Sequence, residues 1–504
     1  MRITPFIFIV GIIILFSSCR KDFSTEFSTG KLEFSKSKIY LDTIFTNISS
    51  STYTLKVYNR SNKDIKIPSI QLGKGLGSKY RIMIDGITGN GKVFNNVELL
   101  AKDSLYVFVE TTVDIASANP TSLTYDDQIL FDSGVNQQKV DLTTLIQDAN
   151  FIFPNRTLNP TIFETISVNG FEAGTRGHTL IATELNWTST KPYVLYENVV
   201  VPSGSILNIA AGTRVYFHNN ATLIVNDGAT LNIAGGLNIF DPVSGALITQ
   251  NEVTFEGDRL EPSFEDTPGQ WGAIFILSNN SNAINHLTLK NAVVGIYSVS
   301  NLNVPKLTIN NSQFYGCSNF GILARNSNIT AKNVVINSSG QASLACLEGG
   351  VYDFTHCTLN NNWASSKQVA VLLSDNFTVN NTTTIANLNS NFKNCIIYGS
   401  NNVELFLDKK GTNYTAIFDH CLTKFNDVNV NLANITLYTS IKNETSGNTK
   451  NVDPKFKNSS KNKLNLLTGS AAIGISNFIN SNFPDIMGQS RTNPSDIGAY
   501  KFIP

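Results

Sequence analysis

The chain has 504 residues, and its 38 Lys and Arg are balanced by 38 Asp and Glu, so the formal net charge is zero. A neutral chain has no general electrostatic attraction to nucleic acid, and we expect no nucleic-acid partner. Charged residues make up only 15% of the chain, and much of the polarity comes from Asn, Ser and Thr. Such side chains suit stacked β-strands, where identical groups can hydrogen-bond one another.

Residues 1–18 have the pattern of a signal peptide. Arg2 supplies a positive charge, and residues 6–16 form an apolar run too short for a comfortable membrane span. The run ends in Phe16-Ser17-Ser18-Cys19, which resembles a bacterial lipobox and implies cleavage before Cys19 and lipidation of that residue. An ordinary signal peptide with a chance cysteine is the alternative. We predict a membrane anchor at Cys19 and a polar tether over residues 19–30.

Residues 31–148 contain segments of alternating apolar and polar residues separated by turn clusters. Residues 53–58, 80–84 and 104–109 show this period of two. Six to eight such strands in roughly 115 residues are typical of an immunoglobulin-like β-sandwich. Residues 149–198 are less regular, and we predict a linker and an N-terminal cap there.

A short unit recurs at a step of eight between positions 199 and 236. Its apolar centres are Val199, Leu207, Val215, Leu223 and Leu231. Turn residues follow the same step at Gly204, Gly212, Asn220, Gly228 and Gly236. Three strand-plus-bend units complete one coil of a parallel β-helix, each coil stacked about 4.8 Å above the last. We therefore predict an all-β chain with a single-stranded parallel β-helix over residues 199–452 and the last coils and C-terminal cap over residues 453–504.

A second register begins at Leu289, in which an apolar residue and a polar residue are followed by Asn or His. The members are Asn291, Asn311, Asn333, His356, Asn394 and His420. We predict that these side chains form a structural ladder at one bend of successive coils, with no metal site. The longest gap, between His356 and Asn394, predicts an inserted loop over residues 366–389. Cys357, Cys395 and Cys421 follow three of these positions and predict a column of core thiols. The isolated His178, His218 and His286 are interpreted as turn or ladder residues.

Several longer motifs carry a family resemblance. Residues 211–218 (AGTRVYFH), 255–262 (FEGDRLEP) and 268–272 (PGQWG) are similar to right-handed β-helix lipoproteins of Bacteroidetes-type bacteria, whose fold resembles that of pectate lyases. The resemblance extends to the sandwich and to the tail, where DIGAY ends the pattern. It implies a right-handed helix, which general crossover handedness also favours. Relatives often carry an Asp where Gly474 stands here, so any role of that Asp is absent.

The densest set of chemically capable residues precedes Trp271. It comprises Asp258, Arg259, Glu261, Glu265 and Asp266. Four carboxylates in nine positions can hold calcium or supply an acid/base pair. The alternative is a solvated loop whose carboxylates pair with its own arginine. We name these five residues as catalytic candidates without assigning a reaction, and expect no cofactor other than calcium in this loop.

Aromatic side chains among polar residues offer stacking surfaces for sugars, and Trp271 and Trp363 are the carbohydrate-binding candidates. We favour an outer-membrane lipoprotein, on the cell surface or the periplasmic face, that binds a glycan or another envelope component without catalysis. The first alternative is a polysaccharide lyase or glycoside hydrolase acting near residues 258–271. The second is a structural or adhesive surface protein.

Overall fold

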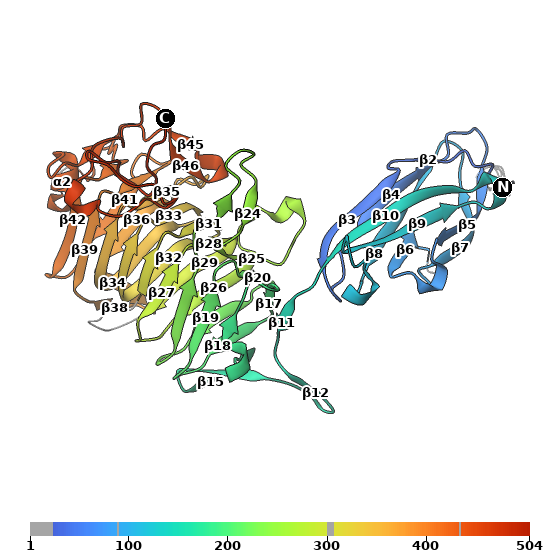
Figure 1. Ribbon diagram of the computed structural model, residues 1–504, viewed down its shortest axis with the longest axis horizontal. Helices are drawn as coiled ribbons and strands as arrows, with labels where there is room; N and C mark the ends of the chain where they lie inside the picture. The colour runs from blue at the N-terminus through green and yellow to red at the C-terminus, as the bar shows by residue number, and fades with distance from the viewer. Residues whose placement is uncertain (1–23, 88–89, 300–306, 433–434) are drawn as a thin grey trace, which may run out of the picture. The chain divides into compact units, whose positions relative to one another are not determined.

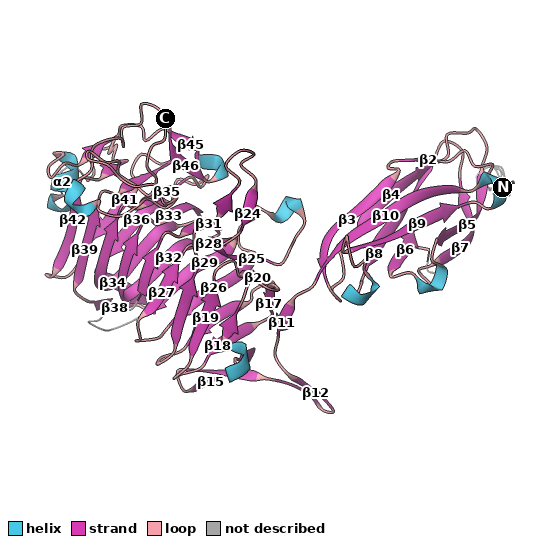
Figure 2. Cartoon of the chain, viewed as in Figure 1, coloured by secondary structure: helices cyan, strands magenta, loops and turns pink. Residues whose placement is uncertain are grey.

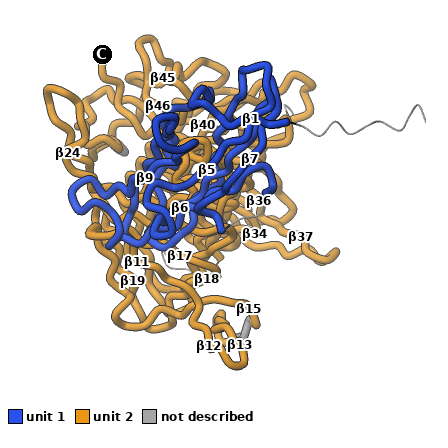
Figure 3. The backbone as a smooth tube through the Cα atoms, turned by 90° about the vertical axis from the view of Figure 1, so that its right-hand side faces the viewer, with its two compact units in different colours: residues 1–148 blue, residues 149–504 orange. Residues whose placement is uncertain are grey.

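The computed structural model describes residues 24–87, 90–299, 307–432 and 435–504. The predicted signal peptide and the lipidation site Cys19 lie outside these ranges. The chain divides into two compact units, residues 1–148 and 149–504 (Figure 3). Strands dominate both units, and the helices are short (Figure 2).

Within the described ranges, no helix combines the length and the apolar character needed to cross a bilayer.

Unit 1 contains two sheets built mainly from antiparallel strands. The first contains β2 (Glu33–Phe34), β4 (Tyr53–Tyr58), β8 (Ser104–Thr111) and β6 (Tyr80–Ile84) in that order. The second contains β1 (Glu26–Phe27), β5 (Ile65–Leu72), β9 (Thr124–Phe131), β10 (Gln138–Gln147) and β3 (Lys38–Phe45), with β7 (Val93–Leu99) paired to β5. The alternation read from the sequence is visible in the burial: Leu55 and Val57 of β4 pair with Val107 and Leu105 of β8, and all four side chains are buried in the core.

The segment predicted as a polar tether contributes to this unit. Residues of β1 pair with β5, and Ser28 donates a hydrogen bond of 2.7 Å to the Asp132 carboxylate. The unit therefore includes residues before position 31. The sequence missed this because a two-residue edge strand carries no periodicity.

Unit 2 consists of two large sheets, here named sheet A and sheet B. In sheet A all pairings are parallel, through β11 (Asn150–Ile152), β17 (Tyr193–Leu195), β20 (Arg214–Phe217), β25 (Val253–Gly257), β28 (Leu287–Lys290), β31 (Gln313–Cys317), β33 (Val335–Ser339), β35 (Thr358–Asn361), β40 (Ile396–Gly399), β43 (Leu422–Thr423) and β44 (Thr449–Lys450).

Sheet B is parallel except for its first pair. Its strands are β14 (Thr165–Val168), β15 (Phe171–Thr179), β16 (Asn186–Trp187), β18 (Asn198–Val201), β19 (Ile206–Ala210), β21 (Thr222–Val225), β22 (Thr230–Ala234), β26 (Trp271–Ile276), β27 (Asn282–Asn285), β29 (Ala292–Val299), β30 (Leu307–Asn310), β32 (Phe320–Lys332), β34 (Ala342–Thr355), β36 (Val369–Ser374), β39 (Leu388–Lys393), β41 (Leu405–Asp408) and β42 (Tyr414–Asp419). Figure 1 shows successive strands lying side by side along this unit.

The eight-residue step of the sequence becomes a pairing of positions three steps apart. Val199 pairs with Leu223, and Leu207 pairs with Leu231, both in parallel register. Three steps of eight thus bring the chain back beside itself. Further along, Phe314 pairs with Ile336 and Ile336 with Leu359, so the chain continues to return beside itself in parallel at nearly even intervals.

Two sequence boundaries shift. Parallel pairing begins at Asn150, where β11 pairs with β17, and β15 pairs with β18. Residues 149–198 are therefore largely part of the stacked sheets rather than only a linker and cap. The insertion predicted over residues 366–389 contains a hairpin of β37 (Asn376–Val379) and β38 (Thr382–Ile385), but it also contains β36, which belongs to sheet B. Further hairpins are β12 (Arg156–Leu158) with β13 (Thr161–Phe163), β23 (Ile239–Phe240) with β24 (Leu247–Thr249), and β45 (Phe456–Asn458) with β46 (Lys463–Leu466).

The interior of unit 2 is a file of stacked side chains. Phe392 stacks between Phe354 and Phe418, with ring centroids 5.2 and 5.3 Å apart. Cys357, Cys395 and Cys421 are free and fully buried, and the Cys395 thiol accepts a hydrogen bond from the Cys357 amide. Burial raises the pKa of the Cys395 and Cys421 thiols well above the usual range, so these residues act as small core side chains.

The bend that leads from sheet B to sheet A is here named the closed bend. One residue of this bend has the same backbone conformation in six successive turns. Each residue has a positive φ between 49° and 54°: His286, Asn311, Asn333, His356, Asn394 and His420. Asn and Gly are the residues that adopt this left-handed conformation most readily. The amide of Asn311 bonds to the carbonyl of Lys332, and that of Asn333 to the carbonyl of Thr355, so one turn is tied to the next.

The predicted ladder therefore needs one correction. Asn291 does not lie at the closed bend, and His286 occupies that position in its turn: the His286 amide bonds to the Asn310 carbonyl, one residue before Asn311. Asn291 lies at the following bend, which leads from sheet A to sheet B and is here named the open bend. There its amide bonds to Tyr315, next to Gly316. Asn291, Gly316 and Ser338 share positive φ values at the open bend.

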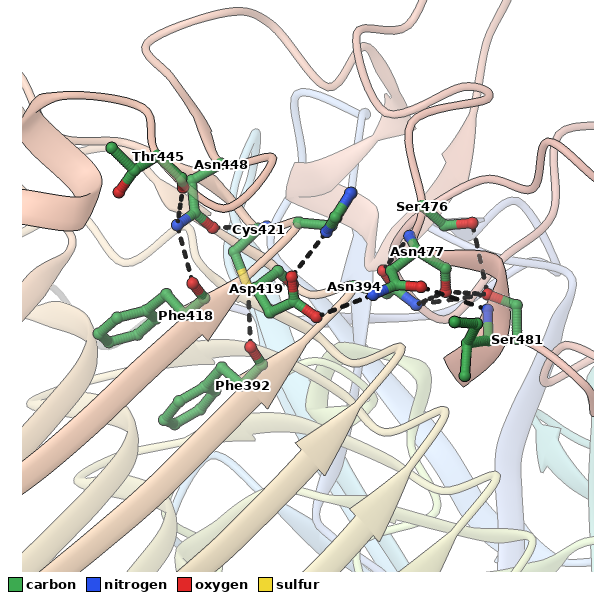
Figure 4. Close-up of polar contacts among 12 residues, drawn as sticks. Phe392, Asn394, Phe418, Asp419, Cys421, Thr445, Asn448, Ser476, Asn477 and Ser481 are labelled. Atoms are coloured by element: carbon green, nitrogen blue, oxygen red, sulfur yellow. Dashed lines mark hydrogen bonds and ion pairs between the residues drawn. The ribbon is translucent and has the colours of Figure 1, made fainter.

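The C-terminal segment, residues 453–504, covers part of the closed bend. Asn394 accepts a hydrogen bond from the Asn477 amide at 2.8 Å and donates one to the Asn477 carbonyl at 3.0 Å (Figure 4). The Arg491 guanidinium donates to the Asn333 side chain at 3.1 Å. Burial, and then the nearby Arg491, lower the pKa of His356 to about 2. At Asn333, His356 and Asn394 the closed bend is consequently buried and structural.

The short helices connect strands and cap ends. They are η1 (Gly75–Gly77), η2 (Ile115–Ser117), η3 (Gly134–Asn136), η4 (Ala182–Glu184), η5 (Pro262–Phe264), η6 (Thr436–Tyr438), α2 (Thr439–Lys442), η7 (Ser459–Lys461) and η8 (Phe478–Asn480). Tyr438 and Ile441, from η6 and α2, are fully buried in the main core of unit 2. They close the last turn, whose apolar interior would otherwise meet water.

Candidate functional site

Residues 258–270, here named the excursion, leave the open bend between β25 and β26. Within the excursion Arg259 pairs with Glu261 at 3.0 Å and lies over the Phe264 ring, 3.9 Å from its centroid. The Gln270 side chain donates to the carbonyls of Phe264 and Thr267 at 2.7 and 2.8 Å. Arg259 and Gln270 thus help to order the excursion from within.

Asn291 anchors the excursion from outside. Its side-chain amide donates to the carbonyl of Glu265 at 3.1 Å and to that of Thr267 at 2.7 Å. The side chain is nearly fully buried. The residue predicted as a ladder member therefore positions the segment that carries Glu265 and Asp266, a role that its sequence triplet does not signal.

A groove of about 420 Å³ lies beside the excursion, and we name it the main groove. Its lining comes from the excursion, the open bend, the segment after β35 and the C-terminal segment: Glu265, Asp266, Pro268, Lys290, Asn291, Tyr315, Gly316, Ser338, Asn362, Trp363, Ala364, Ser460 and Asn462. Two sequence candidates far apart in the chain, Asp266 and Trp363, thus line the same groove. Trp363 is half-buried, so part of its ring system is accessible.

A smaller groove of about 310 Å³, the side groove, shares Glu265, Lys290 and Asn291 with the main groove. Arg259 and Glu261 line it together with Glu256. Of the five catalytic candidates, four therefore border one or both grooves. Asp258 is absent from both linings and points elsewhere.

Asp258 pairs with His218, which follows β20 at the open bend one turn earlier. The His218 Nδ1 lies 2.7 Å from the Asp258 carboxylate, and the imidazole stacks on Tyr196 with centroids 4.5 Å apart. The hydrogen bond to Asp258 raises the pKa of His218. Burial and the Asp258 charge raise the pKa of Tyr196 to about 12. Sequence reasoning missed this pair because a hairpin separates the two residues; the shared position directly after a strand of sheet A was the available signal.

Trp271 is not a sugar platform, contrary to its selection from the sequence. Its side chain is fully buried, stacks on Phe217 with centroids 3.9 Å apart and donates through Nε1 to the Lys290 carbonyl at 2.8 Å. Trp271 begins β26 with its side chain in the core, and Ala273 of the same strand is buried as well. Trp187 is likewise buried, which leaves Trp363 as the accessible tryptophan of the three.

The charged side chains of the two grooves are mostly paired. Lys290 contacts Glu256 at 2.8 Å, and Lys461 from η7 contacts Asp266 at 3.2 Å. The second pair joins the excursion to the C-terminal segment across 195 positions of sequence. Both partners are about two-thirds exposed, so this ion pair contributes little to stability.

Within the described ranges, no three His, Cys, Asp or Glu side chains are placed to share a metal ion. The carboxylates proposed for calcium instead face different partners: Asp258 faces His218, Glu261 faces Arg259 and Asp266 faces Lys461. Calcium binding in the excursion stays a prediction from the sequence.

His178 is the third histidine interpreted as isolated, and it belongs to the first turn of unit 2. Its two ring nitrogens lie 2.9 Å from Glu164 and 2.9 Å from Glu184. Burial opposes its charge, but these hydrogen bonds prevail and raise the pKa. Both carboxylates are thereby satisfied, and we assign His178 a structural role in fastening β15 to η4.

No protein-family model and no curated protein matches the chain. Among solved structures, a family 123 glycoside hydrolase from Clostridium perfringens is 6% identical over 24% of this chain and 30% of its own length, with a TM-score of 0.17. The catalytic domain of Agl-KA is 10% identical over 72% of this chain and 91% of its own, with a TM-score of 0.24. A GH87 alpha-1,3-glucanase from Streptomyces thermodiastaticus is 8% identical over 74% and 84%, with a TM-score of 0.15. Scores this low carry no inference about function.

Proposed function

We propose that the chain is a lipid-anchored envelope protein that binds a glycan in the main groove of unit 2 without cleaving it. The observation that carries the proposal is the meeting of Trp363 with Glu265, Asp266 and Asn362 in one groove. These residues come from separate parts of the sequence, so their convergence is a property of the fold.

The chemistry of the lining suits a sugar. Indole rings present an apolar face with little conformational freedom to lose, and the apolar face of a pyranose can stack on it. Carboxylate and amide oxygens accept hydrogen bonds from hydroxyl groups, and amide nitrogens donate them. A concave site with one apolar surface and several convergent polar groups is the usual form of a small-ligand site.

We also propose the finer architecture that the sequence predicts: an immunoglobulin-like sandwich followed by a right-handed, single-stranded parallel β-helix of a Bacteroidetes-type lipoprotein. The parallel pairing of Val199 with Leu223, three steps of the repeat apart, supports the helix. Two sheets of mainly antiparallel strands support the sandwich. An experimental structure of the whole chain is the direct test.

Anchoring through Cys19 is tested by growing cells with an alkyne-labelled fatty acid. We expect label on the wild-type chain in the outer-membrane fraction and none on Cys19→Ala. Label retained by Cys19→Ala would refute the anchor.

The binding proposal is tested on a glycan array followed by titration of the hits. We expect Trp363→Ala to weaken binding at least about tenfold, because loss of a stacked aromatic removes on the order of 1.5 kcal/mol. Tyr106→Ala, which removes an exposed aromatic of unit 1, is the matched control and should bind as wild type. Equal binding by both variants and the wild type would contradict the site.

The enzymatic alternative is tested on the same preparations. Uronic-acid polymers are incubated with the chain while the ultraviolet absorbance of an unsaturated product is followed, and neutral polymers are followed by reducing ends. The proposal predicts no turnover above buffer. Turnover that Glu261→Gln or Asp266→Asn abolishes would establish an enzyme instead.

A further inference from the structure

The charges around the two grooves do not balance. Four carboxylates line them: Glu256, Glu261, Glu265 and Asp266. Three cations lie against these carboxylates: Lys290 on Glu256 at 2.8 Å, Arg259 on Glu261 at 3.0 Å and Lys461 on Asp266 at 3.2 Å. Each cation is therefore already engaged, and one carboxylate is in excess.

Glu265 is that carboxylate. It borders both grooves and is exposed. Among the described residues its side chain has neither an ion pair nor a hydrogen bond, whereas its backbone carbonyl is held by the Asn291 amide at 3.1 Å. Its backbone also ends η5, where its amide bonds to the Pro262 carbonyl. Glu265 thus borders both grooves from an anchored backbone.

This arrangement selects ligands by charge. A polyuronate would bring carboxylates beside Glu265, and each cation that could receive them would first have to leave its present partner. The uronate carboxylates and the Glu265 carboxylate would repel each other, and the repulsion is strongest at low ionic strength. A protonated amine or a hydroxyl group, by contrast, donates to a carboxylate directly, and the charged donor makes the stronger hydrogen bond.

Building on the glycan-binding function proposed above, we propose that the main groove takes an amino-sugar glycan, that Glu265 is the group that accepts its ammonium, and that polyuronates are rejected. The groove prefers a chain of glucosamine type to a neutral one of the same length, and a neutral one to a uronate. Glu265 sets this order, while Trp363 supplies affinity for all three.

The test is calorimetric titration of the full chain, in detergent, with chitosan, cellulose and polygalacturonate hexasaccharides at mildly acidic pH. We expect binding in the order amino, neutral, uronate. Raising the salt concentration should weaken the amino ligand and leave the neutral one unchanged. Glu265→Gln keeps the size of the side chain and should weaken the amino ligand about fivefold while leaving the neutral one within twofold. Glu98→Gln, at an exposed position of β7 in unit 1, is the control and should change none of them.

The outcomes separate the two proposals. If none of the hexasaccharides binds and the glycan array is also blank, the glycan-binding function fails. If they bind but the uronate binds most tightly, or if Glu265→Gln shifts all three equally, the charge inference is wrong and the binding function stands. Trp363→Ala should weaken every hexasaccharide, which confirms that the same groove is being measured.

Discussion

The two bends of unit 2 adopt the same left-handed backbone and serve different ends. At the closed bend, Asn394 lies between successive strands and the C-terminal segment, fully buried. At the open bend, Asn291 uses the same conformation but turns its amide toward the excursion. The comparison teaches that the covering segment, rather than the bend residue, decides whether a position is structural or borders a site.

The largest effect is expected when the closed bend loses its side-chain contacts. Asn394→Ala removes the hydrogen bonds to Asn477. It also puts alanine at φ 54°, a left-handed conformation that alanine tolerates less well than asparagine. We expect unit 2 to lose about 3 kcal/mol of stability, measured by thermal and denaturant unfolding. Asn394→Gly keeps the backbone and loses only the contacts, so it should lose less. Equal stability of Asn394→Ala and wild type would break the distinction between the bends.

The closed bend also predicts an acid sensitivity. Folding holds the pKa of His356 at about 2, against about 6.5 in an unfolded chain. The unfolded state therefore binds more protons below pH 6.5, and stability is lost as the pH falls from there toward 2. At about pH 4.5 the loss attributable to His356 is on the order of 3 kcal/mol. The variant His356→Asn should remove that part of the pH dependence. Asn is the residue at this position in other turns of the closed bend. Parallel stability curves for the two chains between pH 7 and pH 4.5 would contradict it.

The open bend predicts a change in function with a smaller change in stability. Asn291→Asp cannot donate to the Glu265 and Thr267 carbonyls, so the excursion should loosen while unit 2 loses only about 1–2 kcal/mol. Hydrogen exchange over residues 258–270 should rise, and glycan binding should fall. Asn311→Asp at the closed bend is the matched variant and should leave exchange in the excursion unchanged. An equal rise of hydrogen exchange over residues 258–270 in both variants would contradict the distinction between the two bends.

The smallest effect concerns His218, whose pKa Asp258 raises. A raised pKa stabilises the folded state below the unfolded value near 6.5, and this stabilisation disappears as the pH rises through the folded value. Since the His218 side chain is 48% exposed, solvent screening limits the effect to less than about 1 kcal/mol. His218→Gln should therefore be slightly less stable than wild type at acidic pH and equal to it at alkaline pH. NMR titration of the imidazole checks the direction of the shift.

Much of the stacked architecture could be predicted from the sequence because it is local. The step of eight fixes which side chains repeat on one face, and the pairing of Val199 with Leu223, three steps on, follows from it. A residue that tolerates positive φ marks each bend. The misassignment of Asn291 arose because both bends accept Asn, so the triplet does not identify the sheet that precedes it.

The candidate site could be predicted only in part, because its residues converge through insertions of unpredictable length. The charge of Asp266 and the ring of Trp363 mark them as candidates, but nothing in the sequence places them in one groove. Nothing in the sequence marks Lys461, which pairs with Asp266. Trp271 and Trp363 look equivalent in sequence; the phase of β26 buries the first, and the irregular segment after β35 exposes part of the second.

Tryptophan fluorescence during glycan titration tests the central claim most directly, since Trp187 and Trp271 are buried and Trp363 lines the groove. We predict a saturable change in emission when an amino or neutral oligosaccharide is added, absent in Trp363→Phe and retained in Trp187→Phe. A saturable change that persists in Trp363→Phe would show that the ligand binds elsewhere and would contradict the account.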